Sequence, residues 1–235
     1  MQAETETDRI LREYERRGKE IPADYYALSR PANLFSYHGQ QRALLSALER
    51  FGMVPLDARR IMEIGCGHGQ WLSHFEILGA RRDNLAAIEL DPGRAAVAQE
   101  RFPGADIRVG DATRLPWDDS SFDIVTQSTV FTSILDVPTR AAVAAEMLRV
   151  LKPAGVIVWY DFLFDNPRNA NVQGVGSKEI RRLFTGCLIH LRRITLAPPL
   201  ARRIVPISWS IARLLEHLRM LNTHFLGVIQ KELHD

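Results

Sequence analysis

The chain of 235 residues is 46% hydrophobic and carries 30 Lys and Arg against 28 Asp and Glu, for a net charge of +2. This length and composition suffice for one α/β domain with a full core, and the small net charge gives no overall case for a nucleic acid partner. The first residues are polar, and no uncharged apolar run approaches the roughly 20 residues of a spanning helix, so we expect a cytoplasmic protein without secretory signal or transmembrane segment.

We expect residues 1–55 to form an N-terminal helical lid. A charged helix ends near Gly18, a connector with tyrosines and prolines follows, and a further helix covers about 40–51. The connector includes Leu34 to His38. The two cysteines, Cys66 and Cys187, are an unsuitable disulfide pair because Cys66 lies inside a glycine-rich loop, which fits a reducing compartment.

The glycine-rich loop follows an apolar strand at 61–64 and reads Gly65-Cys66-Gly67-His68-Gly69. Glycines at this spacing let the backbone turn sharply and approach a ligand, and the amides of the next helix point at that ligand. Glu63, directly before the loop, favours a cofactor with an amino group and a sulfonium cation, which describes S-adenosylmethionine. A purely structural glycine turn is the alternative. A nicotinamide dehydrogenase is disfavoured because Gln70 stands where its third glycine is needed.

Acidic residues end the next two predicted strands. The strand at 85–89 ends in Glu89, at roughly the twenty-residue spacing at which a carboxylate accepts both ribose hydroxyls of a bound nucleoside. A strand at 107–109 leads into Asp111, whose carboxylate is placed to accept from an adenine amino group. The alternatives are a surface acid at Glu89 and a simple turn cap at Asp111.

The alternation of strands and helices continues to the C-terminus. We expect helices at 70–78 and 93–101, a strand at 123–127, a helix at 139–150 and a strand at 155–161, then a helix at 177–184 and strands at 190–197 and 223–230. This alternation predicts a doubly wound parallel sheet. We assign residues 56–197 to a cofactor-binding core, 198–222 to a helical insertion and 223–235 to the last strand.

In order along the chain, Glu63 to Gly69, Glu89, Gly110 to Ala112, and the runs 122–125 and 148–155 resemble class I S-adenosylmethionine-dependent methyltransferases. By residue type the resemblance is to the branch that acts on small molecules, quinone precursors and sugars. It implies a Rossmann-like, seven-stranded, mostly parallel sheet with an antiparallel last strand and helices on both faces. It implies cofactor contacts at Glu63, Gly65, Cys66, Gly67 and Gly69, at Glu89 and Leu90, at Asp111 and Ala112, and at Gln127. Ala154 stands where the family often has glycine.

Methyl transfer from a sulfonium needs a dry, aligned pocket more than strong acids. Phe131, Trp159 and Tyr160 are candidates for an apolar wall whose ring faces attract the sulfonium, although ordinary core packing also explains them. A hydroxyl acceptor requires a base. His38 is the first candidate because histidine titrates near neutrality, and Asp161 at the end of the fifth strand is the second.

Both His38 and His68 also have non-catalytic interpretations. A lone histidine at the position of His38 more often has a structural or cofactor-contacting role, and His68 within the glycine loop is a third candidate base that more simply faces solvent.

The residues at the end of the fourth strand disfavour two classes of methyltransferase. Gln127 to Val130 lack the Asn or Asp, paired prolines and aromatic residue of enzymes that methylate nucleobase amino groups. Gln127 also stands where a metal-dependent catechol-type enzyme needs an acid, so no metal is expected.

The C-terminal third is basic. Between residues 178 and 219 nine Lys and Arg face only Glu179 and Glu216, and apolar residues including Trp209 are interleaved with them. This composition predicts contact with an anionic membrane at its inner face, or an anionic or lipid-linked acceptor. The alternative is a lid helix whose arginines face solvent. Nucleic acid ranks lower because no RNA-binding module accompanies the arginines.

The sequence therefore predicts an S-adenosylmethionine-dependent methyltransferase that acts on a small molecule or saccharide, with O-methylation preferred. A non-catalytic S-adenosylmethionine-binding regulator or scaffold remains an alternative, as does a methyltransferase acting on RNA or a lipid-linked acceptor. The oligomeric state stays open.

Overall fold

The structure is a computed structural model that describes residues 5–22, 24–167 and 169–232, so the ends of the predicted lid and last strand, 1–4 and 233–235, lie outside it. Its strands are β1 (Ile61–Ile64), β2 (Leu85–Glu89), β3 (Asp106–Val109), β4 (Phe122–Ser128), β5 (Leu151–Phe162), β6 (Cys187–Leu196) and β7 (Asn222–Lys231). Its helices are α1 (Glu6–Glu20), α2 (Pro31–Arg50), α3 (Leu72–Ile77), α4 (Pro92–Arg101), α5 (Val137–Val150), α6 (Ser177–Leu183), α7 (Pro198–Ile204) and α8 (Trp209–His217). Short 3-10 helices are η1 (Arg82–Asn84), η2 (Phe131–Ser133) and η3 (Arg219–Leu221).

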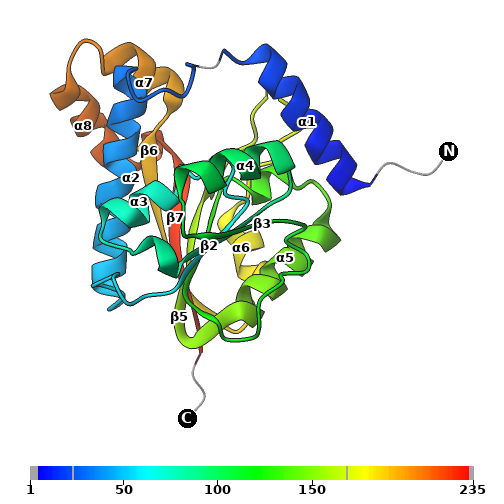
Figure 1. Cartoon of the computed structure of the whole chain (residues 1–235). Helices are drawn as coiled ribbons and strands as arrows, with labels where there is room; N and C mark the ends of the chain where they lie inside the picture. Colours follow the sequence, from blue (N-terminus) through cyan, green and yellow to red (C-terminus); the bar gives the residue numbers. More distant parts are fainter. Residues whose placement is uncertain (1–4, 23, 168, 233–235) are drawn as a thin grey trace.

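The strands form one seven-stranded sheet in the order β3-β2-β1-β4-β5-β7-β6. Strands β1 to β5 pair in parallel, whereas β7 runs antiparallel to both β5 and β6. Helices cover both faces, and the carboxyl ends of the parallel strands meet at one edge below α1 and the α7–α8 pair (Figure 1). The predicted mostly parallel fold with an antiparallel last strand is confirmed.

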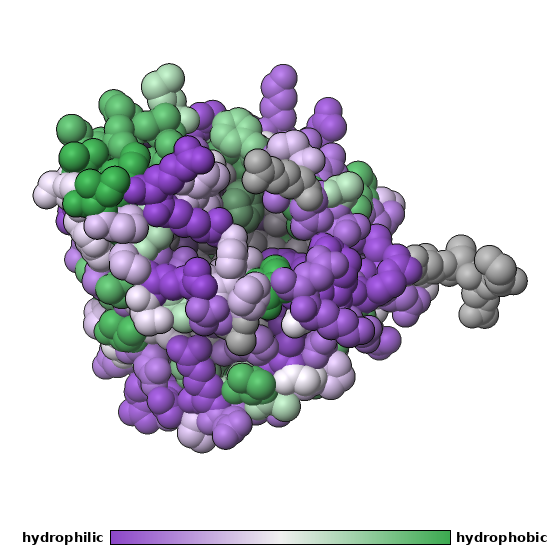
Figure 2. Space-filling view, turned by 90° about the horizontal axis from the view of Figure 1, so that it is seen from above, coloured by the Kyte–Doolittle hydropathy of each residue, from purple (hydrophilic) through white to green (hydrophobic). Residues whose placement is uncertain are grey.

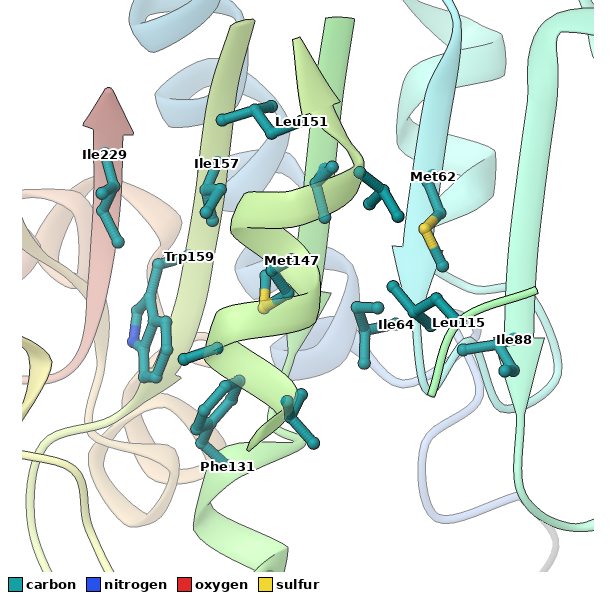
Figure 3. Packing of buried hydrophobic residues seen from close by; sticks show 14 of the residues in the cluster. Met62, Ile64, Ile88, Leu115, Phe131, Met147, Leu151, Ile157, Trp159 and Ile229 are labelled. Atoms are coloured by element: carbon teal, nitrogen blue, oxygen red, sulfur yellow. The ribbon is translucent and has the colours of Figure 1, made fainter. Parts of the chain in front are cut away.

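Two apolar clusters, one on each face, stabilise the sheet. Figure 3 shows the first, in which Met62, Ile64 and Ile157 from the strands pack against Met147 of α5. The second joins α2 and α3 to the opposite face through residues such as Leu44 and Phe75. Because both faces are covered, β1 and β2 are buried along their whole length, which explains their continuous apolar sequences.

Phe131 and Trp159 belong to the first cluster rather than to an open pocket wall. Both are 0% exposed and their ring centroids are 4.5 Å apart (Figure 3). Their burial supports the interpretation as core residues.

The predicted connector before residue 40 is wrong in its second half. Helix α2 begins at Pro31, so Leu34 to His38 are helical. Proline is favourable at the first helical position, because it lacks the N–H group that would have no partner there and because its φ already suits a helix. Pro31 therefore starts α2 nine residues before the predicted start near residue 40. Gly39 continues the helix, and a Cβ there would lie 2.9 Å from a carboxylate oxygen of Glu216, so the glycine permits a close approach of α8.

The predicted insertion contains α7, α8 and η3, and its last residue, Asn222, already belongs to β7. Ser208 caps α8 by accepting from the Ile211 amide. A small third cluster fixes the insertion to the start of α2 and the end of β6, and its buried members are Ala32, Phe35, Leu196, Ala201, Val205 and Ala212. The Phe35 and Trp209 rings meet edge to face, with their centroids 5.5 Å apart.

Helix α1 lies across the carboxyl edge of the sheet (Figure 1). Ile10 of α1 is buried in the first apolar cluster and Tyr14 packs against it, and polar contacts add to this attachment. The Glu6 carboxylate accepts from the Leu135 amide, and Arg9 donates to the Ser133 carbonyl. Such contacts bind α1 to the segment after β4.

Arg140 of α5 is a buried polar anchor and gives the first prediction. It is 1% exposed, its Nε donates to the Ile134 carbonyl at 2.6 Å, and its guanidinium pairs with Glu179 of α6. We expect Arg140→Ala to lower the free energy of unfolding by about 2–4 kcal/mol, because buried polar partners lose their hydrogen bonds.

Urea denaturation measures this change. The matched control is Arg182→Ala on the exposed side of α6, which should shift the unfolding free energy by less than about 0.5 kcal/mol. Equal stability of the two variants would contradict the anchoring role of Arg140.

Candidate functional site

The glycine loop between β1 and α3 depends on left-handed backbone. Gly65, Gly67 and Gly69 have φ values of +61°, +55° and +76°. A Cβ at Gly65 would lie 2.6 Å from the Val130 side chain, and one at Gly69 would lie 2.5 Å from the Phe102 ring. Glycine is therefore required here both by the backbone conformation and by the neighbouring side chains.

Glu63 lies buried directly behind this loop. Its side chain is 2% exposed, and one carboxylate oxygen accepts from the Leu72 amide at the start of α3, 3.1 Å away. Burial raises the pKa of Glu63 well above its ordinary value, and the nearby Glu89 carboxylate adds to that shift. A cation placed beside Glu63 would lower this pKa again, which suits the ammonium group of an amino-acid moiety.

Glu89 ends β2 and contacts the glycine loop. One carboxylate oxygen accepts from the Gly67 amide at 2.7 Å, and the other accepts from the Asp91 amide at 3.1 Å. The guanidinium of Arg94 lies 4.0 Å away. A carboxylate has about four lone-pair positions, so Glu89 retains acceptor capacity for two hydroxyl groups.

The third predicted acid, Asp111, is exposed and caps its own turn. One of its oxygens accepts from the Thr113 amide at 2.8 Å, and the other is 3.4 Å from the Thr7 hydroxyl of α1. The turn-capping alternative is thus realised in the structure, and the second oxygen faces α1. Leu90 and Ala112 at the same edge are partly buried against the core.

Cys66 and Gln127 line the loop from within the protein. Cys66 is buried and free, and burial raises the pKa of its thiol, so it stays protonated. Gln127 is 0% exposed at the end of β4, where its side chain accepts from the Val130 amide at 3.1 Å. The amide side chain therefore shapes the turn through Thr129, whose φ is +56°.

Tyr14 of α1 is a site residue that sequence reasoning missed. Its ring centroid is 4.2 Å from the Arg94 guanidinium carbon, and Arg94 in turn faces Glu89. Burial raises the pKa of Tyr14. The charged composition of α1 gave no signal for this contact, because only the folded chain brings α1 across the end of β2.

The two predicted bases lie in different surroundings. His38 is exposed on α2, with its ring centroid 6.0 Å from that of Trp209 in the insertion. His68 is exposed in the glycine loop. Asp161 is 0% exposed at the end of β5, where its oxygens accept from the Thr132 amide at 3.2 Å and the Phe162 amide at 2.9 Å.

Burial raises the pKa of Asp161 to about 7. This carboxyl group therefore titrates near neutrality at the carboxyl edge, beneath η2. Its two amide bonds also make it an anchor for the segment after β4.

A buried aromatic array lies on the α2 side of the same edge and includes Tyr160, a predicted wall residue that is 3% exposed and belongs to the second apolar cluster. The Tyr160 hydroxyl accepts from the Gln40 side chain at 2.8 Å and lies 3.0 Å from the Thr195 hydroxyl. His224 stacks on the Tyr160 ring at 4.7 Å. The ring centroid of Trp71 also lies 4.9 Å from that of Tyr160. These residues are far apart in sequence, so no local pattern signalled the array.

Two buried histidines in this region are held neutral. Burial lowers the pKa of His224 to about 3 and that of His74 to about 4. His74 stacks on Tyr37 of α2 at 4.2 Å, and its Nδ1 is buried without a hydrogen-bond partner. Within the described residues, no three His, Cys, Asp or Glu side chains gather as a metal site.

Comparison with known proteins agrees with this geometry. Residues 62–159 match the family described as methyltransferase domain. The demethylmenaquinone methyltransferase of Renibacterium salmoninarum is 34% identical over 115 residues, which cover 49% of this chain and 45% of the relative. The phthiotriol/phenolphthiotriol dimycocerosates methyltransferase of Mycobacterium leprae is 29% identical over 137 residues, 54% of this chain and 49% of the relative.

A solved structure extends the likeness of fold to the full chain. The phosphoethanolamine N-methyltransferase 1 of Haemonchus contortus, in complex with phosphoethanolamine and S-adenosylhomocysteine, superposes with a TM-score of 0.65 at 16% identity, covering 100% of this chain and 51% of that one. This chain spans about half the length of the curated relatives it matches.

Residues 62–159 therefore form a domain of the methyltransferase family. The sheet order and the glycine loop agree with the class I S-adenosylmethionine-dependent methyltransferase fold predicted from the sequence, and with S-adenosylmethionine as the cofactor.

The position of Glu89 leads to a prediction for cofactor binding. Glu89→Ala should weaken the binding of S-adenosylmethionine about 100-fold, because hydrogen bonds to a charged group are lost together with the Gly67 contact. Isothermal titration with S-adenosylmethionine, S-adenosylhomocysteine and NADH measures this. Glu100→Ala, on the exposed side of α4, is the matched control and should bind normally. Unchanged affinity in Glu89→Ala would rule out its role.

The raised pKa of Glu63 predicts that cofactor binding is coupled to the release of a proton. Its raised pKa favours the protonated carboxyl in the free protein, and a cofactor ammonium favours the carboxylate. Binding should therefore release a proton, and affinity should rise with pH until it passes the pKa of the free protein. Titrations in buffers of different ionisation enthalpy measure the released proton. Glu63→Gln should remove the release, and a proton release that persists in this variant would assign it to another group.

Proposed function

We propose that this protein transfers the methyl group of S-adenosylmethionine to a hydroxyl group of an apolar small molecule. The observation that carries the proposal is the neutral aromatic array of Tyr37, Trp71, His74, Tyr160 and His224. Apart from Tyr37 these side chains are buried, and they give the α2 side of the cofactor edge an apolar, uncharged interior. An array of stacked rings with neutral histidines suits an apolar acceptor better than a highly charged one. The saccharide acceptor predicted from the sequence stays a prediction.

The names of the relatives point in the same direction. They are methyltransferases of phthiotriol and phenolphthiotriol dimycocerosates and of demethylmenaquinone. These names support an apolar acceptor for this chain.

The acidic and the neutral side chains of the site have different roles. When bound, the cofactor supplies an electrophilic methyl group on a sulfonium cation. Glu63 and Glu89 attract and orient the cofactor, while the low pKa values of His74 and His224 keep further positive charge away from the sulfonium. Because alignment of the reacting groups supplies much of the rate, the left-handed glycines matter by fixing the cofactor's position.

A hydroxyl acceptor must lose its proton, and Asp161 is the better placed of the two candidate bases. Its pKa of about 7 gives a carboxylate near neutral pH that still has appreciable affinity for a proton. It lies beneath η2, the segment that follows the cofactor edge of β4. His38 instead faces Trp209 of the insertion.

The proposed function is tested with methyl-labelled S-adenosylmethionine and a panel of acceptors: a long-chain diol, a hydroquinone, a monosaccharide and a short RNA. We expect label transfer to the first two and formation of S-adenosylhomocysteine in step with it. Transfer only to the monosaccharide or RNA would overturn the apolar acceptor. Cofactor binding without turnover of any acceptor would favour a regulatory or scaffolding protein.

The raised pKa of Asp161 predicts how the rate of methyl transfer depends on pH. The carboxylate is the active form, so methyl transfer should rise with pH and reach a plateau above about 7. Asp161→Asn should lower the rate about 10²–10⁴-fold and flatten the profile, a loss typical of a removed general base. His38→Gln, the comparison variant, should keep the wild-type profile. An Asp161→Asn variant with the wild-type pH profile would reduce Asp161 to an anchor of η2.

A further inference from the structure

The insertion exposes an apolar patch on α8 and its flanking turns. Figure 2, seen toward the carboxyl edge, shows hydrophobic residues gathered over the α7–α8 corner, beside a hollow near the centre of the face. The patch residues, with their exposed fractions, are Ile207 82%, Trp209 38%, Ile211 51%, Leu214 68%, Leu218 50% and Met220 78%. So many exposed large apolar side chains within fourteen residues indicate an interaction surface.

Helix α8 presents different residues on different sides. Ile211, Leu214 and Leu218 recur at a spacing of three and four residues and share an outer face. Ala212 is 0% exposed and faces the third apolar cluster, so the helix already has its packing partner inside the protein. The outer apolar face is additional to what folding requires.

A basic groove borders this patch. It lies between α2, β6 and α8 and is lined by Arg42, Arg192, Arg193, Arg213, His217 and Arg219. Glu216 is the acidic residue among the groove's lining residues, and its carboxylate is 3.5 Å from the Arg42 guanidinium. The groove therefore keeps a net positive charge next to exposed apolar side chains.

Only some of the basic residues between 178 and 219 line this groove. Arg192, Arg193, Arg213 and Arg219 come from the basic run seen in the sequence, and α2 adds Arg42. Arg181 and Arg182, from the same run, lie on α6, which packs against α5 on the other face of the sheet.

We propose that the α8 patch and the basic groove together dock this protein on an anionic phospholipid membrane. The outer side chains of α8 enter the interface between headgroups and acyl chains, and the groove arginines bind lipid phosphates. Arginine suits this role because its planar fork matches phosphate oxygens.

The charges argue for a membrane rather than a second copy of the chain. In a two-fold dimer through α8, each basic groove would approach its equivalent, and the like charges would repel. An anionic bilayer complements both features at once. Docking would also place the α2 side of the site, where Phe35 contacts Trp209, beside the bilayer. Only this last consequence, delivery of an apolar acceptor from the membrane, rests on the proposed function.

Sedimentation of the full chain with vesicles tests the proposal. The protein should pellet with vesicles of phosphatidylcholine and phosphatidylglycerol, remain in solution with phosphatidylcholine alone, and dissociate at high salt. Ile211→Ser with Leu214→Ser, and separately Arg213→Glu with Arg219→Glu, should each lower the partition coefficient at least about tenfold.

Matched variants control for general changes in hydropathy and charge. Ile77→Ser with Val137→Ser removes side chains that are 62% and 65% exposed elsewhere, and Arg181→Glu with Arg182→Glu makes the same charge change on α6. These should bind vesicles like the wild type, and all variants should retain cofactor binding as evidence of folding.

The vesicle result is separate from methyl transfer and can fail alone. No pelleting, equal pelleting with neutral vesicles, or equal losses in the control variants would overturn the proposal. So would a vesicle-independent dimer that the Ile211 and Leu214 changes dissociate.

Discussion

The hydrogen bond from the Gly67 amide to the Glu89 carboxylate, 2.7 Å long, connects the two halves of the cofactor site. It joins the loop after β1 to the end of β2, and it forms only because Gly67 adopts a φ of +55°. A side chain at this position would also meet the Arg94 guanidinium at 2.7 Å. The position of Glu89, and through Arg94 that of Tyr14 on α1, therefore depends on this one left-handed residue.

Buried charge is the second constraint, and it explains why the site suits a cationic cofactor. Glu63 and Glu89 are each 2% exposed, and the charge of Glu89 contributes to the raised pKa of Glu63. Two neighbouring buried carboxylates are costly unless a cation accompanies them. Arg94 supplies one cation, 4.0 Å from Glu89, whereas burial keeps His74 and His224 neutral, so these two histidines supply none.

The sequence could predict what depends on local pattern. The bounds of β1 and β2 agree with the predicted 61–64 and 85–89, since both strands are short apolar runs ended by glycine or an acid. The start of α2 was missed because Pro31 was interpreted as part of a connector. Tyr14, the partners of Tyr160 and the role of Arg42 could not be predicted, because each depends on contacts between segments far apart in sequence.

The two covers of the carboxyl edge are attached by different mixtures of contacts. Helix α1 combines the buried Ile10 with hydrogen bonds such as Asn171 to Glu13 at 2.8 Å. The insertion is fixed by a buried apolar cluster that includes Phe35, 2% exposed, and Val205, 1% exposed. Exposing that cluster to water would be costly, so it holds the insertion against α2. The insertion side is also the one that carries the aromatic array and adjoins the basic groove. The two covers therefore differ in composition: a buried apolar cluster attaches the insertion, whereas α1 adds hydrogen bonds with the segments after β4 and β5 to the burial of Ile10.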